Sequence, residues 1–167
     1  DYPFETPAAG TTLEVAPGVQ WIRLALPIAL NHINLWRIED DDGWTLVDTG
    51  MRTDDVFAAW RQLLAADPDD RRIARVIATH MHPDHVGHAG WITDRINCSL
   101  WVSRLEHVVC RMLVADTGRE APEDGVNFYR AAGWDDAALV NYRKRFGQFG
   151  RMVQAMPDSF RRVTAGE

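Results

Sequence analysis

The sequence has few cysteines and no long hydrophobic run. Cys98 and Cys110 are the only cysteines among 167 residues, and because they form no Cys-x-x-Cys pattern they exclude a disulfide framework and a thiolate zinc knuckle. We expect both to be free thiols. The longest apolar stretch is far shorter than the roughly 18 residues of a membrane span. Residues 1–5 also lack the basic and apolar regions of a signal peptide. Since the chain does not begin with Met, a cytoplasmic protein without membrane contact is only the default expectation.

Basic residues are fewer than acidic ones. The chain has 18 Lys and Arg against 24 Asp and Glu, a formal net charge of -6, which disfavours a nucleic-acid backbone as the main partner. A hydrophobic content of 46% and a charged content of 25% are typical of globular proteins. The length fits one domain of ordinary size.

The first third of the chain consists of short segments rich in β-branched and aromatic residues, separated by turn residues. We predict successive antiparallel strands at residues 11–16, 19–26, 33–39 and 44–48. The period then changes to that of a helix. Thr53 is the predicted N-cap of a helix with Val56, Trp60 and Leu63 on one face, and Asp67-Pro68 is its predicted end.

Three further elements are predicted around the middle of the chain. Residues 75–79 form a compact apolar strand that places His80 at its C-terminal end. A short helix is expected through Ile92 and Ile96, and residues 99–102 read as another strand.

From Ser103 onward the chain is predicted to be largely helical. Ser103 and Glu106 match a capping box. One apolar stripe follows at helical spacing: Leu105, Val108, Val109, Met112 and Leu113. A second series recurs at steps of three and four and predicts a narrow seam that ends at Pro157: Leu139, Tyr142, Phe146, Phe149, Val153 and Met156. We expect this seam to pack on the protein's own elements, and a partner chain is the alternative.

Potential metal ligands are concentrated in one short run. Within Thr79-His80-Met81-His82-Pro83-Asp84-His85-Val86-Gly87, the imidazoles and the carboxylate are donors that suit Zn, Fe(II) or Mn, and two metals could share them. The run follows an apolar strand and precedes a glycine-rich turn, which disfavours an ordinary polar surface loop.

This run, preceded by Thr45-Leu46-Val47-Asp48-Thr49-Gly50 and by Asn34, resembles the metallo-β-lactamase superfamily of metallo-hydrolases. The resemblance implies an α/β (α+β) fold: the first half of an αββα sandwich, with a mixed, mostly antiparallel sheet plus a helical insert. It divides the chain into an N-terminal half-domain at residues 1–102, a helical insert at 103–160 and the start of the second half at 161–167.

The resemblance also assigns the site residues. It implies that His80 and His82 ligate a first metal and that Asp84 and His85 ligate a second. Asp48 would lie beneath the site and hold the ligands through hydrogen bonds. The expected cofactor is one or two Zn ions, with Fe or Mn as alternatives.

The family completes its site with a third His, a bridging Asp and a last His, which this chain does not contain. We therefore expect the full enzyme to continue beyond Glu167. The 167 residues alone are expected to be inactive, to bind metal weakly and to expose an apolar sheet face that favours a homodimer.

Three histidines lie outside the cluster. His32 and His88 are pocket candidates, although a surface loop position for His32 and an ordinary helix start for His88 are favoured. His107 is expected to be a solvated surface residue, because it points away from the Leu105 stripe.

The resemblance implies a metal-dependent hydrolase in which Asp84 orients a metal-bound hydroxide toward an ester-like bond of a small-molecule substrate. Thioesters, lactones and lactams come first and phosphodiesters second. His85 beside Asp84 is the pattern of glyoxalase II-like, lactonase-like and RNase Z-like members, and the acidic balance disfavours the last of these. The alternatives are an iron-dependent, persulfide-dioxygenase-like oxidoreductase and a non-catalytic scaffold that binds a partner.

Overall fold

The structure is a computed structural model that describes residues 3–66 and 72–166. Its strands, in chain order, are β1 (Leu13–Ala16), β2 (Val19–Ala25), β3 (His32–Asp40), β4 (Gly43–Val47), β5 (Ile73–Ile77), β6 (Ser99–Val102) and β7 (Arg161–Arg162). Its α-helices are α1 (Asp54–Ala65), α2 (Pro83–Val86), α3 (Ala89–Ile96), α4 (Arg104–Ala115), α5 (Glu123–Ala131) and α6 (Asp136–Arg145), followed by a 3-10 turn at Phe149–Arg151.

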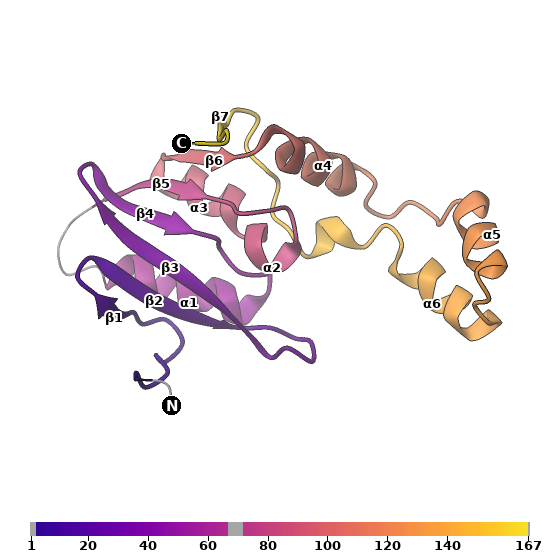
Figure 1. The fold of residues 1–167 in the computed structure, drawn as a ribbon, viewed down its shortest axis with the longest axis horizontal. Helices are drawn as coiled ribbons and strands as arrows, with labels where there is room; N and C mark the ends of the chain where they lie inside the picture. Colours follow the sequence, from indigo (N-terminus) through magenta and orange to yellow (C-terminus); the bar gives the residue numbers. More distant parts are fainter. Residues whose placement is uncertain (1–2, 67–71, 167) are drawn as a thin grey trace.

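The strands form one mixed sheet in the order β1-β2-β3-β4-β5-β6-β7 (Figure 1). Strands β1 to β4 pair antiparallel, and β4 to β7 pair parallel. The expected mixed α/β architecture is confirmed, and the antiparallel strand pairs together are longer than the parallel ones. Parallel pairing matters for the site, because the carboxyl ends of β4, β5 and β6 meet at one edge of the sheet.

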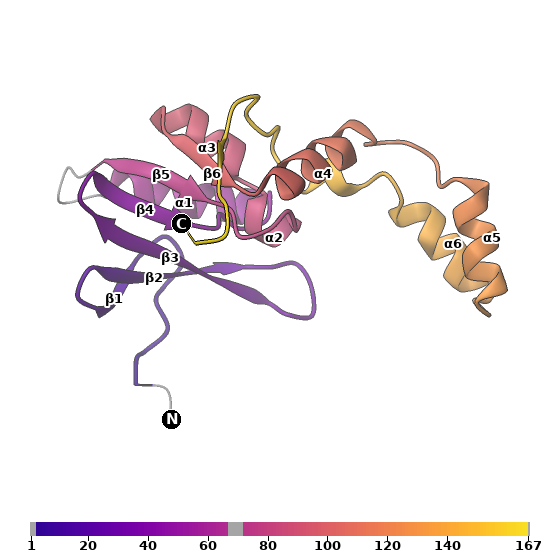
Figure 2. The ribbon, with the colours of Figure 1, turned by 45° about the horizontal axis from the view of Figure 1, so that its top comes forward.

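Helices α1 and α3 cover one face of the sheet (Figure 2). Ile33 and Leu35 of β3 are buried on that face, whereas the alternating residues Asn34, Trp36 and Ile38 are exposed on the opposite face. This period of two follows from the alternation of side chains along a strand. The expectation of exposed apolar side chains on one sheet face is confirmed for Trp36 and Ile38.

Helix α1 begins as the sequence predicts. The side chain of Thr53 accepts a hydrogen bond from the main-chain N–H of Val56, and Val56, Trp60 and Leu63 are buried against the sheet. The predicted end of this helix at Asp67-Pro68 lies outside the described residues.

Helix α4 is oriented differently from the prediction. The predicted apolar stripe is turned largely to solvent: Leu105, Val108 and Met112 are exposed. The buried residues are instead His107 and Cys110. The prediction that His107 is a solvated surface residue is wrong, because its ring stacks on Phe160 and its Nε2 donates a hydrogen bond to the carbonyl oxygen of Pro157. Pro157 and Phe160 belong to a segment about fifty residues away in the sequence, and helical periodicity cannot reveal such partners.

The predicted seam from Leu139 to Met156 is not one helix. Helix α6 ends at Arg145, and Gly147 then adopts a positive φ of 68°, a conformation that favours glycine. Leu139 joins Ala121 and Val126 in a small separate core, whereas Val153 and Met156 belong to the main core. The residues of the seam therefore pack on the protein's own elements, as we expected, but they are divided between two separate hydrophobic cores.

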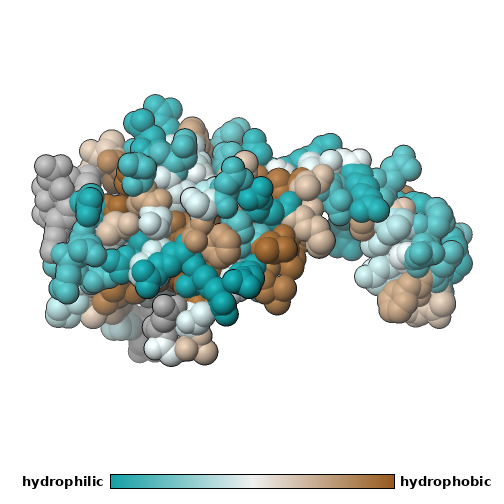
Figure 3. Space-filling view, turned by 90° about the horizontal axis from the view of Figure 1, so that it is seen from above, coloured by the Kyte–Doolittle hydropathy of each residue, from teal (hydrophilic) through white to brown (hydrophobic). Residues whose placement is uncertain are grey.

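Helices α5 and α6 form an arm that extends beyond the sheet (Figures 1 and 2). Hydrophobic side chains reach the surface both on the sheet body and on this arm (Figure 3). The exposed large apolar residues include Ile28 and Leu30 in the β2–β3 turn and Phe128 on α5.

The orientation of α4 can be tested by two neighbouring substitutions. His107→Ala removes a buried ring together with its stacking contact on Phe160 and its hydrogen bond to Pro157. It should lower the free energy of unfolding by about 2 kcal/mol. Val108→Ala at the adjacent exposed position should change it by no more than about 0.5 kcal/mol. Urea denaturation measures both. A larger loss for Val108→Ala than for His107→Ala would show that the apolar stripe faces inward.

Candidate metal centre

The predicted site residues meet at the carboxyl-terminal edge of the parallel strands. Asp48 directly follows β4, and Thr79 and His80 follow β5, which ends at Ile77, two residues earlier than predicted. His82 is the N-cap of the one-turn helix α2, which carries Asp84 and His85. The structure therefore brings together all the residues that the sequence assigned to the cluster.

Asp48 is buried and connects the two strand ends. Its carboxylate accepts hydrogen bonds from the main-chain N–H of Thr79, from the Thr79 hydroxyl and from Nδ1 of His85. The donor and acceptor atoms lie 2.8 Å apart in each of these three bonds. Its own backbone has a φ of 63°, in the left-handed region, where Asp and Asn are tolerated better than most residues. Backbone strain of this kind persists where the surrounding contacts hold the residue in place.

These contacts fix which nitrogen of two histidines carries the proton. His85 donates from Nδ1 to Asp48. The hydroxyl of Thr79 donates to Asp48, so its oxygen accepts from Nδ1 of His80 at 3.0 Å. When each ring is neutral, these hydrogen bonds leave the lone pair on Nε2, which is the form of imidazole that binds a metal.

The donor side chains are close to one another. The ring centroid of His80 lies 4.7 Å from that of His82 and 4.0 Å from that of His85. Nε2 of His85 lies 3.5 Å from Oδ2 of Asp84. The side chains of Asp84 and His85 retain 23% and 25% exposure, so the cluster is open to a ligand from solvent.

The chemistry of these donors fits zinc, because zinc binds imidazole nitrogen and carboxylate oxygen. Within residues 3–66 and 72–166, however, no group of three or more His, Cys, Asp or Glu side chains is arranged around one ion position. The described residues of the cluster therefore do not by themselves present the three protein ligands that a catalytic zinc normally takes.

The charges around the two histidines shift their pKa values in opposite directions. Burial lowers the pKa of His85, but the hydrogen bond and the charge of Asp48, together with the charge of Asp84, outweigh burial and raise it. Burial and the neighbouring His85 and His82 lower the pKa of His80. Near neutral pH, His80 is therefore the more readily available as a neutral donor.

The remaining predicted pocket residues do not join the cluster. His32 lies at the start of β3, partly exposed, with Nδ1 2.7 Å from Oδ1 of Asn31. His88 is the N-cap of α3 and is only 1% exposed, against Phe57 and Trp91. Neither ring nitrogen of His88 meets the distance and angle of a hydrogen bond, although the main chains of Met51 and Thr53 are close enough to influence its charge.

Two residues that hold the cluster were not identified from the sequence. The hydroxyl of fully buried Thr49 donates to the carbonyl oxygen of His85 and accepts from the main-chain N–H of His88. The carboxylate of Glu106, on α4, accepts from the main-chain N–H of Met81 at 2.7 Å. Both contacts join segments at least 25 residues apart. The only sequence signals were that Thr49 follows a predicted strand and that Glu106 belongs to a predicted capping box.

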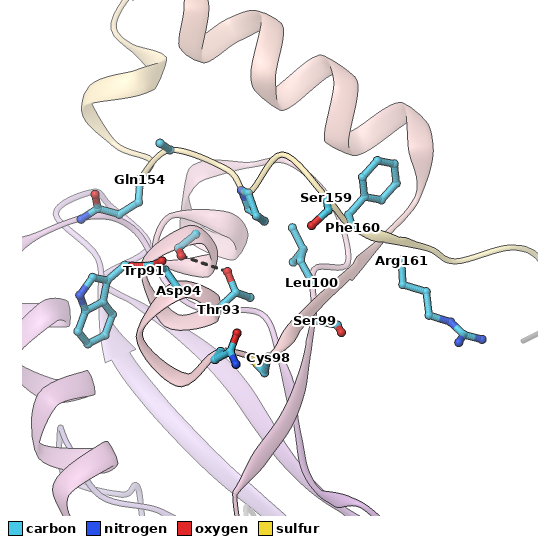
Figure 4. Close-up of a pocket in the computed structure, with 14 residues that line it drawn as sticks. Trp91, Thr93, Asp94, Cys98, Ser99, Leu100, Gln154, Ser159, Phe160 and Arg161 are labelled. Carbon is cyan, nitrogen blue, oxygen red and sulfur yellow. Dashed lines mark hydrogen bonds between the residues drawn. The ribbon is translucent and has the colours of Figure 1, made fainter.

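A large cleft lies away from this cluster, between α3 and the returning segment 154–161 (Figure 4). Trp91, Asp94 and Cys98 line it, but no residue of the histidine cluster does. Burial raises the pKa of the Cys98 thiol to about 11, so this cysteine is a poor nucleophile at neutral pH. As predicted, Cys98 and Cys110 are both free. We therefore place the candidate site at the histidines.

Helices of this protein do not reach the length and apolar character of a bilayer span within the part of the chain that the structure describes.

Known proteins resemble this chain in sequence and in fold. The family model for the metallo-beta-lactamase superfamily matches residues 29–159. The solved structure of a beta-lactamase domain protein from Burkholderia ambifaria is 33% identical, with a TM-score of 0.76, over 100% of this chain and 47% of that chain. A metallo-beta-lactamase family protein from Thermus thermophilus is 20% identical, with a TM-score of 0.59, over 92% of this chain and 48% of that chain. The chain thus spans about half the length of these structures. No curated protein matches it.

Buried His88 should make stability depend on pH. Burial, with a smaller contribution from Arg52, lowers its pKa from 6.5 to about 4, against the opposing effect of the Met51 and Thr53 carbonyls. Between these values the unfolded chain binds a proton that the folded protein does not, so stability falls as the pH falls from 6.5 to 4. The difference corresponds to at most about 3 kcal/mol.

Urea denaturation of wild type and His88→Leu between pH 8 and pH 4 measures this effect. As the pH falls below 6.5, the free energy of unfolding of wild type should decrease relative to that of His88→Leu. Two parallel pH profiles would contradict the assignment of a neutral buried His88.

Proposed function

We propose that this chain, which belongs to the metallo-beta-lactamase superfamily, contributes the first ligands of a metal-dependent hydrolase. The observation that carries the proposal is the convergence of His80, His82 and His85 with Asp84 at one strand edge, held by Asp48. The activity, substrate and partners belong to the whole protein, because the matched structures are about twice as long as this chain.

The residues fall into two donor pairs. His80 and His82 would hold one metal, and Asp84 with His85 would hold another. When bound, zinc supplies a Lewis acid that polarises the scissile bond and lowers the pKa of a water molecule toward neutrality. Zn is the preferred ion, with Fe or Mn suited to the same donor types.

Asp84 has a second role in this proposal. Its partly exposed carboxylate lies at the mouth of the cluster, 3.5 Å from Nε2 of His85. From there it can accept a hydrogen bond from the attacking water and so orient the oxygen lone pair toward the substrate. Asp48 cannot do this, because its carboxylate is buried and bonded to Thr79 and His85.

The substrate class that we propose is an ester-like bond in a small molecule: a thioester, lactone or lactam first, and a phosphodiester second. A lactam is among them because the relative from Burkholderia ambifaria is named a beta-lactamase domain protein. The net charge of -6 disfavours a polyanionic nucleic-acid substrate.

Metal content and hydrolysis test the proposal together. The whole protein, purified without chelator, should contain zinc, and EDTA should remove both the metal and the hydrolysis of a panel of thioester, lactone and lactam compounds. Stoichiometric iron with oxygen consumption in the presence of a persulfide would favour an oxidoreductase instead. Metal-free protein that binds no added zinc would contradict the proposal.

A single substitution tests the role of Asp84. Asp84→Ala with saturating zinc should lower kcat by about 100-fold or more, because it removes the group that orients water. Asp94→Ala, an exposed aspartate on α3 outside the cluster, is the matched control and should keep wild-type turnover. Wild-type kcat in Asp84→Ala with metal bound would show that another residue orients the water.

A further inference from the structure

Glu106 does not complete the capping box that the sequence predicts. Ser103 does its part, since its Oγ accepts from the main-chain N–H of Glu106 at 3.2 Å. The carboxylate of Glu106, however, extends away from its own helix and accepts a hydrogen bond from the main-chain N–H of Met81 at 2.7 Å.

Met81 occupies a sensitive position, because it is the residue between His80 and His82. These residues lie in the irregular segment between β5 and α2, so no sheet or helix ladder fixes their backbone. Asp48 fixes the beginning of the segment at Thr79, and the carbonyl of His82 fixes its end by accepting from the N–H groups of His85 and Val86. Glu106 fixes the middle of this segment through its hydrogen bond to Met81.

The hydrogen bond from the main-chain N–H of Met81 to the carboxylate of Glu106 is expected to be strong. Hydrogen bonds with a charged acceptor are roughly twice as strong as neutral ones, and the contact is partly buried and therefore less screened by water. Because one peptide plane joins two residues, an anchor at the N–H of Met81 restrains the backbone of both His80 and Met81.

We propose that Glu106 is a positioning residue through which helix α4 holds the His80–His82 segment in the orientation that binds metal. Glu106 touches neither the metal nor the substrate in this role. The proposal rests on the proposed metal function. It makes metal affinity depend on a helix that contributes no metal ligand.

The zinc affinity of the whole protein is the first test, measured by competition with a chromophoric chelator. Glu106→Ala should weaken zinc binding by about 10-fold or more, which is the usual effect of removing a group that orients metal ligands without contacting the metal. Glu106→Gln should restore most of the affinity, because its amide oxygen can still accept from Met81. Ser103→Ala removes the cap of the same helix without touching Met81, and is the matched control that should keep wild-type affinity even if it lowers Tm.

Amide hydrogen exchange in the metal-free protein is the second test. Glu106→Ala should speed exchange at Met81 by at least about 10-fold, while exchange at Thr79, which bonds to Asp48, stays unchanged. Unchanged exchange at Met81, or equal zinc affinity in Glu106→Ala and Ser103→Ala, would overturn the positioning role.

The two proposals fail in different ways. Wild-type protein that binds no zinc would contradict the metal function and with it the effect of Glu106 on affinity. Weak zinc binding in Glu106→Ala and Glu106→Gln alike, with wild-type binding intact, would contradict only the role of the hydrogen bond to Met81.

Discussion

The buried carboxylate of Asp48 is the interaction on which the site depends. It lies where β4 ends, in a left-handed backbone conformation, and binds Thr79 and His85 at the same time. A buried carboxylate is costly unless its oxygen atoms are hydrogen-bonded. Here the oxygen atoms accept hydrogen bonds from Thr79 and His85, which follow β5. The hydrogen bonds that offset the cost of burying Asp48 are therefore the same ones that join the ends of β4 and β5.

The neighbours of Asp48 extend this connection. Thr49 bonds to the carbonyl of His85, and the indole N–H of Trp60 bonds to the carbonyl of Thr49. Gly87 follows α2, and a Cβ there would collide with the carbonyl oxygen of Gly50, so only glycine allows the two backbones to approach this closely. The donors of the candidate metal centre therefore rest on main-chain and buried polar contacts, with the side-chain tautomers set by the same network.

The sequence was sufficient for the part of the fold in which local patterns agree with tertiary packing. The four antiparallel strands, the Thr53 cap and the delivery of His80 by β5 follow from alternation, capping and a buried apolar run. The orientation of α4 did not follow, because Leu105 and Val108 have the spacing of a buried face but lie on the exposed one. Periodicity shows that a face is apolar and cannot show what covers it.

The site was predictable to a similar extent. Ligand types at close spacing identified His80, His82, Asp84 and His85, and the resemblance to the metallo-β-lactamase superfamily assigned Asp48. The contacts of Thr49 and Glu106 were not predictable, because each depends on a partner brought near only by the folded sheet.

We infer that Asp48 organises these donors into a metal centre without binding the metal itself. The zinc affinity of Asp48→Asn compared with that of wild type tests it most directly, because asparagine tolerates the same left-handed backbone and leaves every donor in place. Zinc binding should weaken by about 10- to 100-fold while the fold is retained, because the carboxylate that orients the donors is lost. Wild-type zinc affinity in Asp48→Asn would contradict it.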